Sequence, residues 1–363
     1  MLVNKAFIFR IYPNSEQQIQ INKTLGCSRF VFNHFLDVSK TAKYQGYNYC
    51  SKELTVLKSK LLWLKEADKF ALQNSLKDLN ASYKNFFGKR GKYPKFKSKR
   101  NEKNSYRTNF TNNNIEIREN YIKLPKLKWV QFANSREVQG RILSVTVSKT
   151  NTEKYFVSVC CEVEVLPLPE TSAQTGIDLG LKSYATTSDG VNYNHPKALL
   201  RLEKKLKKLQ KSYSRKKKDS KNQNKCRQKI ALLHERIANI RMDYIHKLST
   251  KLINENQVIV MESLNTLSML KNKRLAKQIA DASWGEFAKQ VEYKSLWYGR
   301  TFMQVDTYYP SSQTCSSCGY IHTEVKDLSV RTWVCPKCNE IHDRDKNSAV
   351  NILNEGLKNI KIA

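Results

Sequence analysis

The chain has 363 residues, of which 40% are hydrophobic, enough for two or three domains with buried cores. Its 64 lysines and arginines outnumber its 32 aspartates and glutamates, for a formal net charge of +32. Folding needs no such excess, so we expect a polyanionic partner, with nucleic acid ahead of an anionic membrane surface. The chain has no long apolar segment and no signal-peptide pattern at its start, so we expect a cytoplasmic protein without a membrane partner.

The first half of the chain changes from helical to strand periodicity. Residues 5–12 are apolar and aromatic with interleaved basic residues, which predicts a strand. Apolar residues then recur at helical spacing as far as about Phe87. From 106 to 165 the pattern is one of short β segments, and 142–148 and 155–163 flank turn residues as the arms of a hairpin would.

Pro167 and Pro169 mark a boundary, after which strands and helices alternate. The predicted elements are a strand or hairpin at 176–187, a basic helical stretch at 195–254, a strand at 257–261, an aromatic-rich helix at 282–298, a strand at 302–308 and a closing helix at 346–359. Open α/β sheets form their functional sites at the carboxyl ends of strands.

Three separated carboxylates are placed where they could form one site. Asp178 lies between two glycines of an apolar segment, Glu262 ends the strand at 257–261, and Asp345 begins the last helix. Mg²⁺ prefers oxygen ligands, and a pair of Mg²⁺ ions roughly 3.5–4 Å apart can cleave a phosphodiester. Each acid could instead be a turn residue or helix cap, and Asp343 is an alternative for the third position. On so basic a chain, the set predicts a metal-dependent nuclease with Asp178, Glu262 and Asp345 as catalytic residues and magnesium ligands.

Four of the nine cysteines form two Cys-x2-Cys pairs, which predict a closed structural Zn²⁺ site of four thiolates. The ligands are Cys315, Cys318, Cys335 and Cys338. The other cysteines show no framework spacing, which favours a reducing compartment. His322 and His342 lie nearby, and we expect them to be surface residues because the four-ligand set is complete.

Two basic stretches are candidates for contact with nucleic-acid backbone. Residues 197–229 carry 15 lysines and arginines but two acids, which favours phosphate contact over a merely solvated face. Residues 89–100 interleave aromatic and basic side chains, which suits backbone tracking with base stacking. The nucleic-acid-binding candidates in these stretches are Tyr93, Lys95, Lys97, Arg100, Lys204, Lys205, Lys208, Arg215, Lys216 and Lys217. The chain has no Walker-type loop, so nucleotide triphosphate use is not indicated.

With these motifs in place, the chain resembles the OrfB/TnpB family of transposon-encoded RNA-guided DNA endonucleases, which is related to the type V CRISPR effector nucleases. The matching segments are 5–13, 26–33, 72–87, 93–97, 176–180, 261–262, 311–315 and 343–351. The nuclease and zinc segments are specific together, whereas those near the N-terminus are less so. Ser348 stands where an alanine is common in the family, and we expect no functional consequence.

The resemblance implies an α+β multidomain fold in which a helical recognition lobe interrupts an N-terminal β-barrel, the wedge or OB-like domain. An RNase H-like (RuvC) α/β nuclease domain with an inserted four-cysteine zinc ribbon follows. The expected bounds are 1–12 and 105–169 for the wedge, 13–104 for the recognition lobe and 170–363 for the nuclease domain, including a basic helical segment at 196–254 and the zinc ribbon at 311–342.

The resemblance also implies how the protein acts. A guide RNA from the transposon end would pair with target double-stranded DNA beside a short adjacent motif, and two Mg²⁺ ions would support cleavage. The protein would be prokaryotic, cytoplasmic and associated with the nucleoid when bound to DNA. The alternatives are an RNA-guided repressor without cleavage and an unguided transposase or structure-specific nuclease. The three retained carboxylates favour cleavage over repression, and the sequence does not specify an oligomeric state.

One helix is a candidate for reading the adjacent motif. Polar side chains read the edges of bases in duplex DNA, and amide side chains suit adenine. The helix that begins near Ala71 carries Gln73, Asn74 and Lys77 beside its apolar face, within the expected recognition lobe. The alternative is that they are ordinary exposed helix residues.

Overall fold

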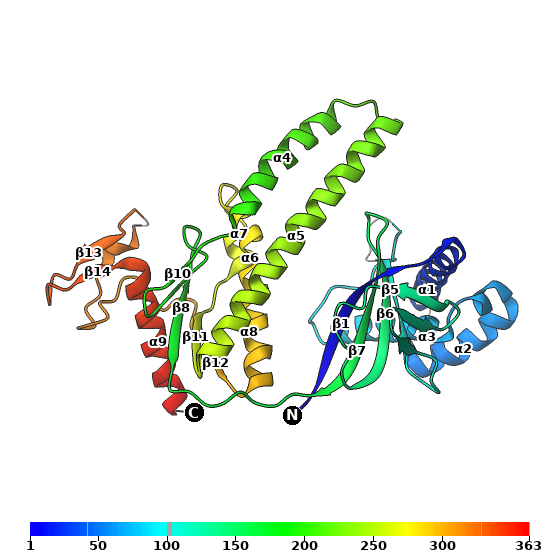
Figure 1. Ribbon diagram of the computed structural model, residues 1–363, viewed down its shortest axis with the longest axis horizontal. Coiled ribbons are helices and arrows are strands. Elements are labelled where there is room, and N and C mark those ends of the chain that lie inside the picture. Colours follow the sequence, from blue (N-terminus) through cyan, green and yellow to red (C-terminus); the bar gives the residue numbers. More distant parts are fainter. Residues whose placement is uncertain (42, 100–103, 328, 363) are drawn as a thin grey trace. The chain divides into compact units, whose positions relative to one another are not determined.

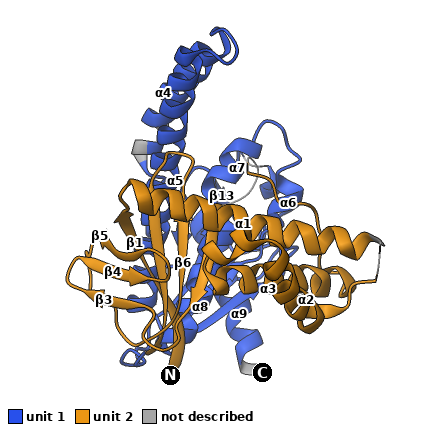
Figure 2. Ribbon diagram, turned by 90° about the vertical axis from the view of Figure 1, so that its right-hand side faces the viewer, with its two compact units in different colours: residues 1, 165–363 blue, residues 2–164 orange. Residues whose placement is uncertain are grey.

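The computed structural model describes residues 1–41, 43–99, 104–327 and 329–362, and the chain divides into two compact units (Figure 2). One unit is Leu2–Glu164. The other is Val165–Ala363 together with Met1, whose amino group donates a 2.7 Å hydrogen bond to the Val165 carbonyl. No described helix is both long enough and apolar enough to cross a membrane.

A seven-stranded antiparallel sheet forms the frame of the Leu2–Glu164 unit, in the order β2-β6-β7-β1-β5-β4-β3. The strands are β1 (Leu2–Tyr12), β2 (Asn104–Asn109), β3 (Glu116–Arg118), β4 (Tyr121–Leu124), β5 (Lys128–Phe132), β6 (Arg141–Lys149) and β7 (Tyr155–Glu164). Phe7, Phe9 and Ile11 on β1 are buried while Ile8 is exposed, as expected for a strand with one face in the core. The predicted strand at 5–12 and the predicted β6–β7 hairpin are confirmed.

Three α-helices separate β1 from β2 in the chain, and they share a core of their own. They are α1 (Ser15–Thr41), α2 (Gly46–Lys60) and α3 (Lys69–Phe87), with the 3₁₀ turn η1 (Leu62–Glu66) between α2 and α3. Phe35 of α1, Leu54 of α2 and Leu76 of α3 meet in this core. Asp68 caps α3 by accepting a hydrogen bond from the Phe70 backbone N–H. The helical periodicity up to Phe87 is therefore confirmed.

The Val165–Ala363 unit is built on a mixed five-stranded sheet, in the order β10-β9-β8-β11-β12 (Figure 1). The strands are β8 (Gln174–Leu179), β9 (Ala185–Thr187), β10 (Asn192–Tyr193), β11 (Val258–Glu262) and β12 (Thr301–Val305). β8, β11 and β12 run parallel, whereas β9 and β10 are antiparallel additions. The predicted hairpin at 176–187 and the strand at 257–261 are confirmed.

Helices cover both faces of this sheet. Ile177 and Met261 pack with α5 (Lys221–Glu255) and α8 (Trp284–Tyr298) on one face. Val260 and Gly176 lie against α9 (Arg344–Ile362) on the other. The short helices α6 (Thr266–Met269) and α7 (Ala276–Ala282) precede α8, and β13 (Thr332–Val334), β14 (Ile341–Asp343) and the 3₁₀ turn η2 (Thr323–Lys326) precede α9. The α8 and α9 predictions are confirmed to within a few residues.

The predicted basic helical stretch at 195–254 is an antiparallel pair of helices. It consists of α4 (Lys197–Ser214) and α5, which Ser220 caps by accepting a hydrogen bond from the Gln223 backbone N–H. Leu206 of α4 packs against Leu233 and Ile237 of α5. The part of the pair nearest the α4–α5 connection extends away from the sheet of this unit (Figure 1).

Candidate functional site

Two adjacent parallel strands place Asp178 and Glu262 at one edge of the five-stranded sheet. Met261 of β11 lies opposite Ile177 of β8, so the next residue along each strand is one of the two acids. Side chains alternate between the two faces of a strand, and both acids lie on the face of the sheet that packs against α9. Glu262 Oε1 accepts a 2.9 Å hydrogen bond from the Leu179 backbone N–H, which fixes the carboxylate across the strand pair. The structure thus brings together two of the three predicted acids.

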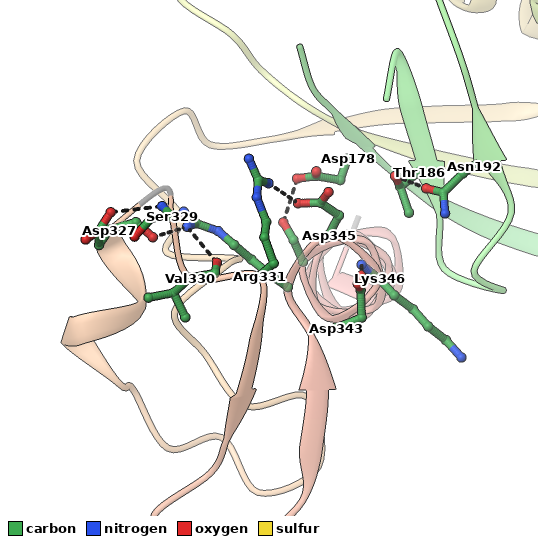
Figure 3. A network of polar contacts seen from close by, with 12 residues as sticks. Asp178, Thr186, Asn192, Asp327, Ser329, Val330, Arg331, Asp343, Asp345 and Lys346 are labelled. Atoms are coloured by element: carbon green, nitrogen blue, oxygen red, sulfur yellow. Dashed lines mark hydrogen bonds and ion pairs between the residues drawn. The ribbon is translucent and has the colours of Figure 1, made fainter. Parts of the chain in front are cut away.

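The third acid joins them because α9 packs directly on β8. A β-carbon at Gly176 would lie 2.1 Å from the Ala349 carbonyl oxygen, so this approach requires glycine. Asp345, in the first turn of α9, lies near enough for its charge to raise the pKa of Asp178. Figure 3 shows the two carboxylates beside each other.

Burial is the main cause that opposes ionisation of Asp178 and Glu262. Burial is the largest cause that raises the pKa of Asp178 well above its ordinary value, followed by the charges of Glu262 and, more weakly, Asp345. Burial also raises the pKa of Glu262 to about 7, against the lowering effect of its hydrogen bond from Leu179. Closely spaced carboxylates in a partly buried site resist ionisation together, and a bound cation relieves that cost.

Asp343 and Asp345 have different surroundings. Asp343 is exposed, and its Oδ1 accepts a 2.9 Å hydrogen bond from the Lys346 backbone N–H, as an N-terminal cap of α9 does. Asp345 faces the other acids and is the one whose charge acts on Asp178. The geometry therefore favours Asp345 for the third position, with Asp343 as a helix cap.

One cation contacts this group from the segment that carries the cysteine pairs. Arg331 Nη1 lies 3.2 Å from Asp345 Oδ1, and the pair is partly exposed (Figure 3). The Arg331 carbonyl also accepts a 2.8 Å hydrogen bond from the Arg344 N–H at the start of α9. No sequence pattern singled out Arg331, because its distance from Asp345 depends on how this segment folds back on α9.

The three carboxylates have the chemistry of a hard divalent cation site. They offer oxygen ligands alone, as Mg²⁺ prefers. Burial raises the pKa values of Asp178 and Glu262, and the charges of the neighbouring acids add to the rise at Asp178. Asp178, Glu262 and Asp345 are the residues that would hold such an ion. Glu262 is anchored by Leu179 and Asp178 by Ser348, so both would present a fixed oxygen to it.

The four predicted cysteines form a cluster that could bind a metal such as zinc. The Sγ atoms of Cys315, Cys318, Cys335 and Cys338 all lie within 4.8 Å of one another. Each pair sits in a turn in which the residue after the second cysteine has positive φ, +74° at Gly319 and +59° at Asn339. The backbone N–H of each of these residues donates to the carbonyl of the first cysteine of its pair. These turns give the thiols the convergent arrangement of a four-thiolate site.

The expectation that His342 is a surface residue was wrong. His342 is 6% exposed, its ring lies 4.8 Å from that of Trp333, and its Nε2 lies 3.0 Å from Cys315 Sγ. Its position on β14, paired with β13, turns it inward beside the cysteines. His342 therefore belongs to the shell of groups around the thiols, where hydrogen bonds orient metal ligands.

Two buried asparagines tie the cysteine-bearing segment to α9. Asn347 accepts a 2.9 Å hydrogen bond from the Ser316 N–H and donates one of 2.7 Å to the Thr314 carbonyl. Asn351, one turn later, donates to the carbonyls of Ser311 and Thr314. The asparagine of the Asp-x-Asn motif thus anchors the first cysteine turn to the helix that carries Asp345.

The predicted nucleic-acid contacts of the α4–α5 pair lie on its outer surface. Leu206 and Leu209 lie on the side of α4 that packs against α5, so the lysines lie on the outer side. Lys204, Lys205, Lys208, Arg215 and Lys217 are exposed, and Lys216 is half-buried. No described ion pair involves any of these six cations, so their charges are free to act on a partner.

The candidates in the Leu2–Glu164 unit have more varied surroundings. Tyr93 and Lys95 are exposed, and Arg100 lies outside the described residues. Lys97 is partly committed within the protein, since its Nζ lies 4.2 Å from the centre of the Phe32 ring and 3.6 Å from Asp78 Oδ2.

Of the motif-reading candidates, Lys77 is exposed and Gln73 half-buried, but Asn74 is 4% exposed. The Asn74 amide donates hydrogen bonds to the Arg107 carbonyl at 2.8 Å and to Asn109 Oδ1 at 3.2 Å. Asn74 is therefore not the exposed helix residue that the alternative interpretation supposed. It lines a polar pocket of about 290 Å³ together with Arg29, Lys97 and Arg107.

Three family models match separate parts of the chain. Residues 158–273 match the OrfB_IS605 model, described as "Probable transposase". Residues 284–352 match the TNB domain of Cas12f1-like proteins, and residues 1–47 match a helix-turn-helix domain of the OrfB_IS605 type. In the described part of that last range the chain forms β1, α1 and the start of α2.

Relatives match the chain over nearly its whole length. A protein of Streptomyces pristinaespiralis, named among the RNA-guided DNA endonucleases, is 38% identical over 98% of this chain and 90% of its own. InsQ of Escherichia coli K12, with a name of the same kind, is 35% identical over 97% of this chain and 92% of its own. A cryo-EM structure of a Cas12f1–guide RNA–target DNA complex shares the fold, with a TM-score of 0.62 and 15% identity, over 98% of this chain and 99% of that one.

Proposed function

Because the chain belongs to the OrfB/TnpB family, we propose that it is an RNA-guided DNA endonuclease that uses a transposon-derived guide RNA. The observation that carries this proposal is the meeting of Asp178, Glu262 and Asp345, which are far apart in sequence, at the edge of one sheet. A repressor that binds without cutting would not need three acids at one site, two of them with pKa values raised chiefly by burial. The +32 charge supplies the affinity for nucleic acid that the activity requires.

In this proposal Asp178, Glu262 and Asp345 would hold Mg²⁺, which would supply an activated water and charge stabilisation at the leaving oxygen of the phosphodiester. The protein's own groups set the geometry. The Leu179 N–H holds Glu262 across the strand pair, and the Ser348 hydroxyl contacts Asp178. Arg331 balances the charge of Asp345 from the cysteine-bearing segment, which we assign as a zinc ribbon.

We assign the parts of the chain on the same basis. The seven-stranded sheet corresponds to the wedge domain, α1–α3 to the recognition lobe, and the five-stranded sheet with its helices to the RuvC-like nuclease domain. The cations of α4 and of the α4–α5 connection would contact phosphates of the guide RNA or its duplex with target DNA. Sequence would be read by base pairing, while the protein reads a short adjacent motif in duplex DNA.

The polar pocket of the Leu2–Glu164 unit supports a place for motif reading. Arg29, Lys97 and Arg107 line it together with the acid Asp78, which pairs with Lys97 and Arg107. Gln73 and Lys77 lie on the helix that forms one of its walls. Asn74 would shape the pocket, because its amide hydrogens are used within the protein. Gln73 and Lys77 are then the better candidates for contact with base edges.

The test is to purify the protein from cells that carry its transposon, sequence the bound RNA, and assay cleavage with Mg²⁺. We expect one RNA of defined sequence and cleavage only of DNA that matches it beside a fixed motif. Guided binding without cleavage would identify a repressor instead. Cleavage that survives ribonuclease treatment would identify an unguided nuclease or transposase and would contradict the proposal.

A further inference from the structure

A buried hydroxyl connects the catalytic edge of the sheet to the base of the zinc ribbon. Ser348 Oγ lies 2.7 Å from Asp178 Oδ1 and 2.9 Å from Ser311 Oγ, and Ser348 is 1% exposed. Ser311 is also buried and begins the segment that leads to Cys315. The expectation that a serine at position 348 has no consequence therefore does not fit its surroundings.

The number of hydrogens fixes the direction of this chain of contacts. A serine hydroxyl has one hydrogen to donate, and an ionised carboxylate can only accept. Ser348 must therefore donate to Asp178 when that group is ionised. The contact at 2.9 Å then has Ser311 as the donor and Ser348 Oγ as the acceptor. Each donor in such a series strengthens the next, because donating a hydrogen bond polarises the hydroxyl.

Two asparagines of α9 hold Ser311 and its segment in place through contacts that do not involve Ser348. The Ser311 carbonyl accepts a 2.8 Å hydrogen bond from Asn351 Nδ2, and Asn351 and Asn347 both bond the Thr314 carbonyl. The orientation of the Ser348 hydroxyl is thus set by a loop whose other end carries the first cysteine turn.

We propose that Ser348 is a positioning residue for Asp178 and that Ser311, at the base of the zinc ribbon, fixes the direction of its hydroxyl. This inference rests on the proposed function, because it requires Asp178 to bind the catalytic metal. One hydrogen bond leaves most of the lone pairs of the Asp178 carboxylate free for a metal ion. It restricts the rotation of the carboxylate, as groups around metal ligands commonly do. Packing alone would not favour a hydroxyl at position 348, because burying a hydroxyl costs free energy unless it forms hydrogen bonds.

Metal binding tests the proposal without reliance on cleavage. Mn²⁺ serves as the probe. Its binding to the full-length, zinc-loaded protein is measured by electron paramagnetic resonance after removal of RNA. The Mn²⁺ binding that is lost in Asp178→Ala is taken as the binding at this site. We expect Ser348→Ala to weaken that binding about 10- to 100-fold, the usual effect of losing a group that orients a metal ligand. Ser311→Ala should weaken it less, because Ser348 can still donate.

A double-substitution cycle separates a relay from two unrelated effects. If Ser311 acts through Ser348, Ser311→Ala should change nothing further once Ser348→Ala is present. Ser312→Ala is the matched control, because this neighbouring serine makes no hydrogen bond to the site in the described chain. Cleavage adds a second readout: Ser348→Ala should raise the Mg²⁺ concentration for half-maximal rate more than it lowers the rate at saturation.

Two results would overturn the inference. Mn²⁺ binding by Ser348→Ala within about twofold of the unaltered protein, well below the loss expected for an orienting group, would show that the hydroxyl does not position Asp178. Unchanged Mn²⁺ binding by Asp178→Ala would remove both the inference and the proposed site. Thermal unfolding of each variant confirms that it is folded, and Ser311→Ala provides a second test that leaves α9 unaltered.

Discussion

Arg331 Nη1 lies 3.2 Å from Asp345 Oδ1, so a side chain of the cysteine-bearing segment contacts one of the three acids directly. Arg331 precedes β13 by one residue, and β13 leads into the second cysteine turn. Asn347 and Asn351 join the first cysteine turn to the same helix. The cysteine-bearing segment therefore contacts α9 both from its first cysteine turn and through Arg331, and its folding bears on where Asp345 lies.

The first prediction concerns the three acids. Asp178→Ala, Glu262→Ala and Asp345→Ala should each abolish Mg²⁺-dependent cleavage of guided DNA, because metal ligands act as a unit. Binding of guide RNA, measured by filter retention, should be largely unchanged.

Asp343→Ala is the matched control for this series. It should keep cleavage and lose about 1 kcal/mol of stability, the usual cost of removing a helix cap. Loss of cleavage in Asp343→Ala with normal cutting by Asp345→Ala would move the third position to Asp343.

The second prediction concerns pH. Burial raises the pKa of Glu262 from 4.5 to about 7, so the folded state binds a proton that the unfolded state releases between these values. Stability without added Mg²⁺ should therefore be fully retained below about pH 4.5 and fall as the pH rises to about 7. At about 1.4 kcal/mol for each pKa unit, the loss amounts to about 3 kcal/mol.

Chemical denaturation of the protein without added Mg²⁺ at a series of pH values measures this dependence of stability on pH. Glu262→Gln should reduce it, because glutamine does not titrate, and Asp178, whose pKa burial also raises, should account for the slope that remains. Mg²⁺ should have the same effect, because a bound cation favours the ionised carboxylate. A slope that persists unchanged in Glu262→Gln would assign it to other groups.

The third prediction concerns zinc. Cys315→Ser and Cys338→Ser should each lose the metal, about one Zn²⁺ per chain by elemental analysis in the unaltered protein. Val325 and Trp333 are the main apolar residues packed beside the cysteines, so the ribbon has little core to fold around without metal. We expect a lower unfolding temperature and at least a tenfold loss of cleavage, because a disordered ribbon releases Arg331 from Asp345 and unties Asn347.

Cys160→Ser is the control for the zinc series, since Cys160 lies on β7 in the Leu2–Glu164 unit. Its zinc content and cleavage should be unchanged. A protein free of zinc that still folds and cuts normally would show that the ribbon has no structural role for the nuclease site.

The fourth prediction concerns the exposed cations of α4. Replacing Lys204, Lys205 and Lys208 with glutamine should weaken guide RNA binding and lower the salt slope by about 0.7–0.9 for each phosphate that is no longer neutralised. Sequence preference should not change, because phosphate contacts carry no sequence information. Lys247 and Lys251 of α5, which pair with Asp243 and Glu255, are matched controls and should leave the slope unaltered. An equal change in both sets would indicate a general charge effect.

The fifth prediction concerns the adjacent motif. Gln73→Ala or Lys77→Ala should relax the motif requirement in a cleavage screen of a motif library, at about 1–3 kcal/mol for removal of a bidentate hydrogen bond to a base. Asn74→Ala should instead cost stability, about 1–3 kcal/mol, because it leaves the Arg107 carbonyl and Asn109 without their donor. An unchanged motif profile in both Gln73→Ala and Lys77→Ala would return these residues to the ordinary helix surface.

The sequence by itself determined the parts of this protein whose signal is local. Apolar periodicity located β1, β8, β11 and the long helices, because the spacing of buried side chains differs between strands and helices. The paired cysteines identified a cluster of four thiols because knuckle turns need close spacing. Asp178 and Glu262 stood out because each belongs to an apolar strand segment, where a carboxylate is unusual.

The tertiary structure alone decided how distant residues meet. Ser348 and Asp178 are 170 positions apart, and their contact exists because Gly176 lets α9 approach β8. The same approach separates Asp345, which faces the other acids, from Asp343, which caps the helix. The pairing of β13 with β14 buries His342. The side-chain amide of Asn74 is engaged in a hydrogen bond to β2. Burial and hydrogen bonding between segments depend on packing, and no spacing along the chain encodes them.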